Sequence, residues 1–224
     1  MQVTSIRTFV FCMLLIPAAV FAEADQTVVA TLQHDWAIAN YQVSGDEQEK
    51  AFEALMEKAN AAVAGSPESA ELWIWNGIIQ SSFAGAKGGL GALSLAKQAR
   101  TSLEKAMTLD DKALNGSAFA SLGTLYFKVP GWPVGFGSDK KAVQLLEKAL
   151  KINPEGIDPN YFYADYLIDK KDYADAEKYL LRAQNAAPRA DRPIADSGRH
   201  EEILAALSLI REKMGRSTVA TTSH

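Results

Sequence analysis

Three histidines and two groups of carboxylates are the side chains in this sequence that could support metal binding or acid–base catalysis. His34, His200 and His224 are far apart, and none is followed three or four residues later by a second metal ligand on the same helix face. The acidic residues in 47–57 and 172–177 fall where helices are expected to begin, where negative charge suits the helix dipole. We therefore predict no metal site, no cofactor and no catalytic residue. A glycosidase-type carboxylate pair is the enzymatic alternative, because a sequence does not show separation in space.

Two glycine-rich segments, residues 83–93 and 129–137, have the composition of phosphate-binding loops but not their spacing. Neither contains G-x-x-x-x-G-K-[ST] or G-x-G-x-x-G, and neither follows an expected strand. The chain has 23 basic and 27 acidic residues, a net charge of -4, and no basic cluster. Because nucleic-acid binding begins with a basic face that neutralises phosphates, we exclude nucleic acid as a partner.

The first 22 residues have the pattern of a secretory signal peptide. Arg7 is followed by an unbroken apolar run over residues 9–21, which ends at Ala22. This run is shorter than the roughly 20 residues that span a bilayer. We expect cleavage after Ala22 and a periplasmic protein without a membrane anchor. The single cysteine, Cys12, lies in this segment without a lipoprotein acceptor sequence, so the mature chain is expected to have no thiol.

One helical pattern occurs four times along the chain. An apolar or Ala residue is followed four and then three positions later by another, and a Pro or Asp comes five positions after that. These spacings place the side chains on one helix face, and a Pro beyond the end stops the helix. The four copies are Leu55/Ala59/Ala62/Pro67, Ala99/Leu103/Ala106/Asp111, Ala142/Leu146/Ala149/Pro154 and Ala176/Leu180/Ala183/Pro188.

A second helix with a Gly or Ala between two large residues precedes each of the last three copies. A small side chain at this position allows the partner helix to cross closely. Within the first of these helices, Trp73 and Trp75 point in nearly opposite directions, so one of them is expected to line a groove. The three patterns are Trp73/Gly77/Gln80, Phe119/Gly123/Tyr126 and Asn160/Ala164/Leu167.

On these residues the sequence resembles the tetratricopeptide repeat (TPR) family, whose unit is a 34-residue pair of antiparallel helices. Pro154 and Pro188 are separated by that length. The resemblance implies an all-α, TPR-like right-handed superhelix of antiparallel helix pairs over residues 26–215. We expect an amphipathic capping helix at about 196–214, with Ile203, Leu204, Leu207 and Ile210 on one stripe, and a disordered tail at 216–224.

The glycine-rich segments are insertions in this pattern, at the turn inside the second and third helix pairs. Equivalent turns of neighbouring repeats lie side by side, so we expect the two insertions to touch. The second, aromatic insertion is either a lid folded onto the core or a contact surface. The residues that we predict for the insertion surface are Lys87, Leu90, Trp132, Val134 and Phe136.

In the TPR family, the first helices of successive pairs line the concave face that receives ligands. Carried over to this sequence, the resemblance implies a groove without the Lys and Asn cluster of chaperone-docking TPR domains. The groove residues implied for a ligand or partner are Ile74, Ile78, Ser81, Thr124, Phe127, Lys128, Tyr161 and Asp165.

More narrowly, the leader, the insertions and the stretch 158–167 resemble the T component of tripartite ATP-independent periplasmic (TRAP) transporters. This resemblance implies a periplasmic scaffold that binds another protein, such as the substrate-binding component of the transporter. The family is commonly lipid-anchored, and this sequence departs from it there. The alternative is a carrier that binds a small apolar ligand beneath the two insertions.

Overall fold

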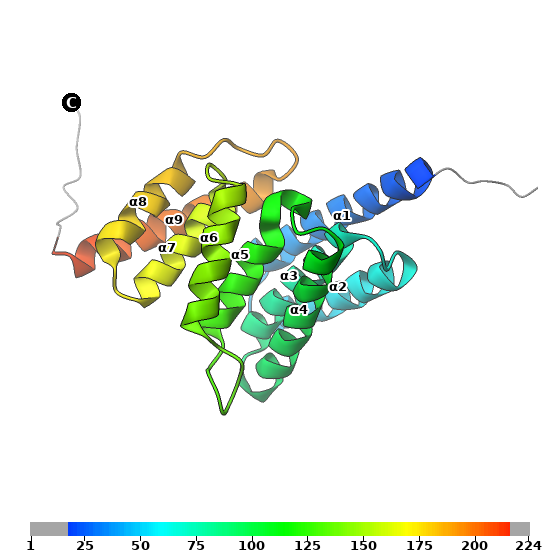
Figure 1. Ribbon diagram of the computed structural model, residues 1–224, viewed down its shortest axis with the longest axis horizontal. Helices are drawn as coiled ribbons and strands as arrows, with labels where there is room; N and C mark the ends of the chain where they lie inside the picture. The colour runs from blue at the N-terminus through cyan, green and yellow to red at the C-terminus, as the bar shows by residue number, and fades with distance from the viewer. Residues whose placement is uncertain (1–17, 216–224) are drawn as a thin grey trace, which may run out of the picture.

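The computed structural model describes residues 18–215, and in that range all the regular elements are α-helices, without a strand (Figure 1). The expected leader lies for the most part outside the described residues, as does the tail at 216–224. The helices are α1 (Ala18–Tyr41), α2 (Gly45–Gly65), α3 (Ala70–Lys87), α4 (Gly89–Leu109), α5 (Ala113–Lys128), α6 (Asp139–Ile152), α7 (Ile157–Asp169), α8 (Tyr173–Gln184) and α9 (Pro193–Lys213).

The helices form four successive pairs, α1/α2, α3/α4, α5/α6 and α7/α8, followed by α9. The repeated pattern of the sequence falls on the second helix of each pair, and its central residues are removed from water. Leu103, Leu146 and Leu180 are each 0% exposed. The predicted all-α helical repeat is therefore confirmed.

The glycines on the first helices allow the two helices of a pair to cross closely. A Cβ at Gly77 would lie 2.6 Å from Cγ of Leu103, and a Cβ at Gly123 would lie 2.8 Å from Cγ of Leu146. In the last pair Ala164 takes the same place and is fully buried. Each small residue thus faces the repeated leucine of its partner helix.

Alanine at Gly77 is expected to destabilise the protein by about 1–3 kcal/mol, because Leu103 has no room to shift. Gly85 on the same helix is a matched control, since nothing lies within 4 Å of a Cβ there. Gly85→Ala should stabilise by about 0.5–1 kcal/mol, the helix preference of Ala over Gly. Urea unfolding of both variants measures the difference, and equal effects would contradict the close crossing.

The last helix, α9, makes contacts beyond those expected of a capping helix. It packs on α7 and α8 and also returns to α1, where a Cβ at Gly198 would meet the ring of Tyr41. The hydroxyl of Tyr41 donates to Glu202 Oε2 at 3.4 Å. The two ends of the helical array are thereby joined across its inner face. Leu204, expected on the buried stripe, is 54% exposed, so this part of the prediction is wrong.

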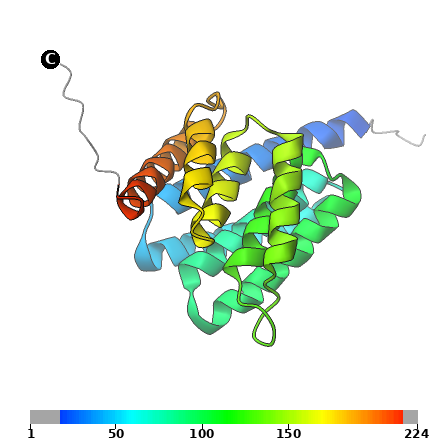
Figure 2. The ribbon, with the colours of Figure 1, turned by 60° about the vertical axis from the view of Figure 1, so that its left-hand side comes forward.

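The first insertion is helical and not a loop. The extra residues lengthen both helices of the second pair, and the turn between them is at Gly88. Gly88 and Gly89 have φ angles of 62° and 57°, which L side chains rarely adopt. The second insertion is a compact hairpin, in which Gly137 N donates to Pro130 O at 2.9 Å. Both lie at the same end of the molecule (Figure 1 and Figure 2).

The first helix, α1, begins inside the expected leader. It runs from Ala18 to Tyr41 and therefore includes the predicted cleavage point. The first hydrogen bond between α1 and another element is at Asp25, whose carboxylate accepts from Ser66 Oγ at 2.7 Å. Cleavage after Ala22 would leave this contact and the buried residues from Val29 onwards in place.

Candidate functional site

A cavity of about 550 Å³ lies on the inner side of the helical array. Its walls come from α1, α3, α5 and α7, and the segment that leads into α9 completes it. Aromatic rings form much of the lining: Trp36 packs edge-on against both Tyr41 and Trp75, each at 5.7 Å between centroids. Phe162 faces the cavity from α7. The cavity therefore offers flat apolar surfaces, and it has the size of a small-molecule site.

The start of α5 enters this cavity in an unusual conformation. Leu114, Asn115 and Gly116 have φ angles of 47°, 55° and 75°, in the left-handed region. A non-glycine residue there costs of order 1 kcal/mol or more, and such strain is concentrated at functional sites. All three residues line the cavity.

Ion pairs hold α7 and α9 together beside the cavity. We call Asp158, Arg189, Asp196, Arg199 and Glu202 the ion-pair cluster. Asp158 accepts from Arg189 Nη1 at 2.6 Å and from Arg199 Nε at 3.1 Å. Burial alone would raise the pKa of Asp158, but Arg199 and Arg189 lower it to about 2. Asp158 thus stays charged and fixes both arginines.

Arg192 also lines the cavity, but it lies outside the ion-pair cluster and has no carboxylate partner there. It makes no ion pair with any residue in 18–215, and its Nε is buried without a hydrogen-bond acceptor. The guanidinium lies over the ring of Trp75, 5.1 Å from the centroid. Burial and the neighbouring Arg189 lower its pKa. An arginine nevertheless remains protonated, so this is a partly buried cation without a counter-ion.

Trp75 presents a second unused donor in the same wall. It is only 2% exposed, and its Nε1 has no hydrogen-bond acceptor. Trp36 differs, because its Nε1 donates to Ser82 Oγ at 2.8 Å. Trp73 points the other way and donates to Pro67 O. Of the two tryptophans two residues apart, Trp75 is the one that lines the cavity.

The predicted groove residues lie in several different environments. Ile78 lines the cavity, whereas Ile74 is fully buried in the core and cannot line a groove. The Ile74 prediction is wrong because α1 packs on α3 and Ile74 lies in the core, whereas an open superhelix would expose this face. Ser81 is half-buried and donates to Ile78 O at 2.8 Å.

The other predicted groove residues link α5 to α7. Lys128 pairs with Asp165 at 2.9 Å, and Phe127 packs edge-on against Tyr166. Because Lys128 and Asp165 neutralise each other, neither is an unpaired charge for a partner. Thr124 Oγ1 donates to its own helix, at Ala120 O.

Tyr161 is half-buried and contacts α9. It lies against Arg199, whose guanidinium carbon is 4.3 Å from the ring centroid. Burial raises the pKa of Tyr161 to about 12.

The hairpin at 129–137 is divided between the core and the surface. Phe136 is folded inward, 5.5 Å from the ring of Tyr126 and beneath Arg100. Trp132 is 90% exposed and Val134 is 65% exposed. The base of the hairpin is therefore structural, and its tip is an exposed apolar surface on an ordered turn.

The two insertions meet at Leu93 and Gly135, where a Cβ on the glycine would lie 3.4 Å from Leu93 Cδ1. Lys87 is paired with Glu49 at 2.7 Å, and the Leu90 side chain lies outside the described residues. No described residue of 83–93 or 129–137 lines the inner cavity. The predicted place for an apolar ligand, beneath the insertions, is filled by Phe136 and Tyr126.

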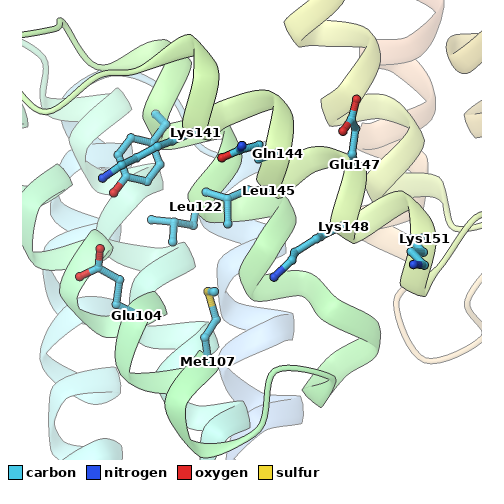
Figure 3. Close-up of a pocket in the computed structure, with 10 residues that line it drawn as sticks. Glu104, Met107, Leu122, Lys141, Gln144, Leu145, Glu147, Lys148 and Lys151 are labelled. Atoms are coloured by element: carbon cyan, nitrogen blue, oxygen red, sulfur yellow. The ribbon is translucent and has the colours of Figure 1, made fainter.

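An open groove of about 610 Å³ lies on the outer face, between α4 and α6. Met107, Leu122 and Leu145 form its floor, and charged side chains surround them (Figure 3). Two of its lysines cover aromatic rings: Lys141 lies over Tyr126 and Lys148 over Phe119. Both lysine cations are therefore held over aromatic rings of the core.

The described residues contain no group of three or more His, Cys, Asp or Glu that could hold a metal. Within the same range, no helix is long and apolar enough to cross a membrane. His200 is placed between two backbone carbonyls, with Nδ1 2.8 Å from Asp196 O. His34 is exposed, and His224 lies outside the described range.

Sequence reasoning missed the arginines at 189, 192 and 199. They follow the last recognisable repeat, and only the fold brings them to α3 and α7. α7 begins at Ile157, and the carboxylate of Asp158 in its first turn binds two of these arginines. Three arginines within eleven residues, just before and inside the final helix, were the available signal.

Comparisons with known proteins identify part of this architecture. No curated protein matches the chain. The crystal structure of MamA protein is similar in outline, with 15% identity and a TM-score of 0.44, over 88% of this chain and 98% of that chain. The family model described as tetratricopeptide repeat matches residues 140–197. Those residues, which form most of α6, all of α7 and α8 and the start of α9, therefore carry the tetratricopeptide repeat that the sequence pattern predicts.

Proposed function

We propose that this chain is a non-enzymatic scaffold that binds another protein, and that the tip of the 129–137 hairpin is its docking point. TPR segments generally mediate protein–protein contacts, and residues 140–197 match that family. The observation that carries the proposal is Trp132, 90% exposed beside Val134 on an ordered turn.

The shape of the tip determines the kind of partner. Exposed aromatic residues, Trp above all, contribute most of the binding energy when they enter an apolar pocket of a partner. A projecting hairpin cannot supply that pocket, so the partner must be concave and apolar at the contact. Phe136 and Tyr126 anchor the hairpin, which reduces the ordering cost of binding.

Trp132→Ala is expected to weaken partner binding by about 2 kcal/mol or more, roughly 30-fold, while changing stability by less than about 0.5 kcal/mol. Co-purification of the full chain from its native host, followed by titration of the isolated partner, measures the loss. Leu204→Ala is the matched control, since Leu204 is also an exposed apolar residue but lies on α9. Equal binding of the two variants would refute docking through the hairpin.

We further propose that the scaffold acts in the periplasm, on the basis of the leader pattern in residues 1–22. An alkaline phosphatase domain fused after His224 should be active in cells, because that enzyme requires disulfides that form only outside the reducing cytoplasm. Deleting residues 2–22 should abolish the activity. Activity that survives the deletion would contradict export by this leader, and an inactive full-length fusion would contradict a periplasmic location.

A role beside a TRAP transporter is a more specific form of this proposal and rests on the sequence resemblance alone. It names the substrate-binding component as the partner. Direct titration of that purified component, with Trp132→Ala as the negative control, tests it.

A further inference from the structure

We infer that the inner cavity is a binding site for a small organic carboxylate with a flat apolar body. This inference goes beyond the proposed docking function, because the hairpin contributes no residue to the cavity. It rests on two buried donors without acceptors, an unpaired cation and aromatic walls.

Arg192 is the residue that would bind the carboxylate end of the ligand. Its Nε is buried without an acceptor, and the side chain makes no ion pair with any residue in 18–215. A buried cation without a counter-charge is costly unless a bound anion supplies it. A planar guanidinium matches the two oxygens of a carboxylate.

Trp75 adds an independent observation. Its Nε1 is a buried donor without an acceptor, in the wall over which Arg192 lies. Buried donors are normally satisfied, so two unused donors at one wall indicate a missing acceptor.

The carboxylates near Arg192 either pair with other arginines or are exposed to solvent. Asp158 accepts from Arg189 and Arg199, and Asp196 accepts from Arg189. Glu155 and Asp191 line the cavity at its rim, where both are exposed. None of them forms an ion pair with Arg192 within the described residues, so its guanidinium has no carboxylate partner from that range.

The walls of the cavity indicate the shape of the apolar body of the ligand. Trp36, Trp75 and Phe162 present ring surfaces, and Ile78 and Ala195 present small aliphatic ones. A cavity of about 550 Å³ holds a ring with a short side chain. The same carboxylate chemistry is found in a free aromatic acid and in the terminal residue of a peptide that ends in Phe.

Calorimetric titration of the purified protein with phenylacetate and with phenylacetamide tests the inference, because the two probes differ chiefly in charge. We expect phenylacetate to bind at least tenfold more tightly and to quench tryptophan fluorescence. Acetyl-Gly-Gly-Phe as acid and as amide forms the second arm, which distinguishes a free acid from a chain terminus. Preference for the acid in either arm supports the site; no binding of either acid, or equal binding of acid and amide in both arms, overturns it.

Arg192→Gln should remove the preference for the acid, and Arg192→Lys should restore part of it. Arg182→Gln is the matched control, since Arg182 also lies over an aromatic ring, that of Tyr179, but outside the cavity. Thermal unfolding of each variant checks that the fold is kept. Unchanged preference in Arg192→Gln overturns the inference. Trp132→Ala should bind phenylacetate normally, so failure of the docking proposal is distinguishable from failure of this one.

Discussion

Replacing Asp158 with alanine is expected to lower the free energy of unfolding by about 3 kcal/mol, because two arginines would lose their shared carboxylate. Arg199 is the more sensitive of the two, since its side chain is only 8% exposed. Urea unfolding at neutral pH measures the loss. Glu201→Ala is the control: Glu201 is an exposed acid on the same helix as Arg199. A loss no greater than that of the control would contradict the role assigned to the ion-pair cluster.

The same carboxylate gives the protein a defined dependence on pH. Arg199 and Arg189 lower the pKa of Asp158 to about 2 in the folded protein, against the opposing effect of burial. A lowered folded pKa contributes stability above the unfolded value of about 4, and that stability is lost as the pH falls through the folded value. The free energy of unfolding should therefore fall between about pH 4 and pH 2. The fall should be smaller in Asp158→Ala, and an identical fall in both proteins would contradict the assignment.

Leu180→Ala is expected to lower the free energy of unfolding by about 2–5 kcal/mol, because the side chain is completely buried between α7, α8 and α9. The truncation leaves a cavity beside Ala164 and Ile203, which are themselves fully buried. Stability measured by chemical denaturation tests this expectation.

The neighbouring residue provides the control for Leu180. Leu181 lies on the same helix and is 37% exposed, so Leu181→Ala should cost less than about 1 kcal/mol. If the two substitutions cost the same, the assignment of the repeat pattern to the buried face of α8 would be wrong.

The repeat was predictable from the sequence because it depends on local spacing. Apolar and small residues at intervals of four and three define one helix face, and close crossing requires Gly or Ala opposite the repeated leucine. Gly77 and Gly123 satisfy that requirement in the structure. Such information is contained within about 34 residues, so no knowledge of distant contacts is needed.

The inner cavity could not be predicted, because it depends on contacts between the two ends of the chain. Arg192 reaches Trp75 only because α9 returns to α1, and no local pattern specifies that return. Ile74 is also buried by a contact between elements, since α1 packs on α3, although its helix position suggested a groove residue. The first insertion lengthens α3 and α4, and most of its glycines lie in those helices on either side of Gly88.

Photo-crosslinking from position 132 in living cells of the native host tests the docking claim most directly. A photoreactive phenylalanine analogue in place of Trp132 should form one dominant adduct with another protein, because the exposed side chain enters that protein's pocket. The same analogue at Leu204, an exposed position on α9, should not form that adduct. No protein adduct at 132, or the same adducts from both positions, would contradict the proposal that this chain is a scaffold that docks through its hairpin.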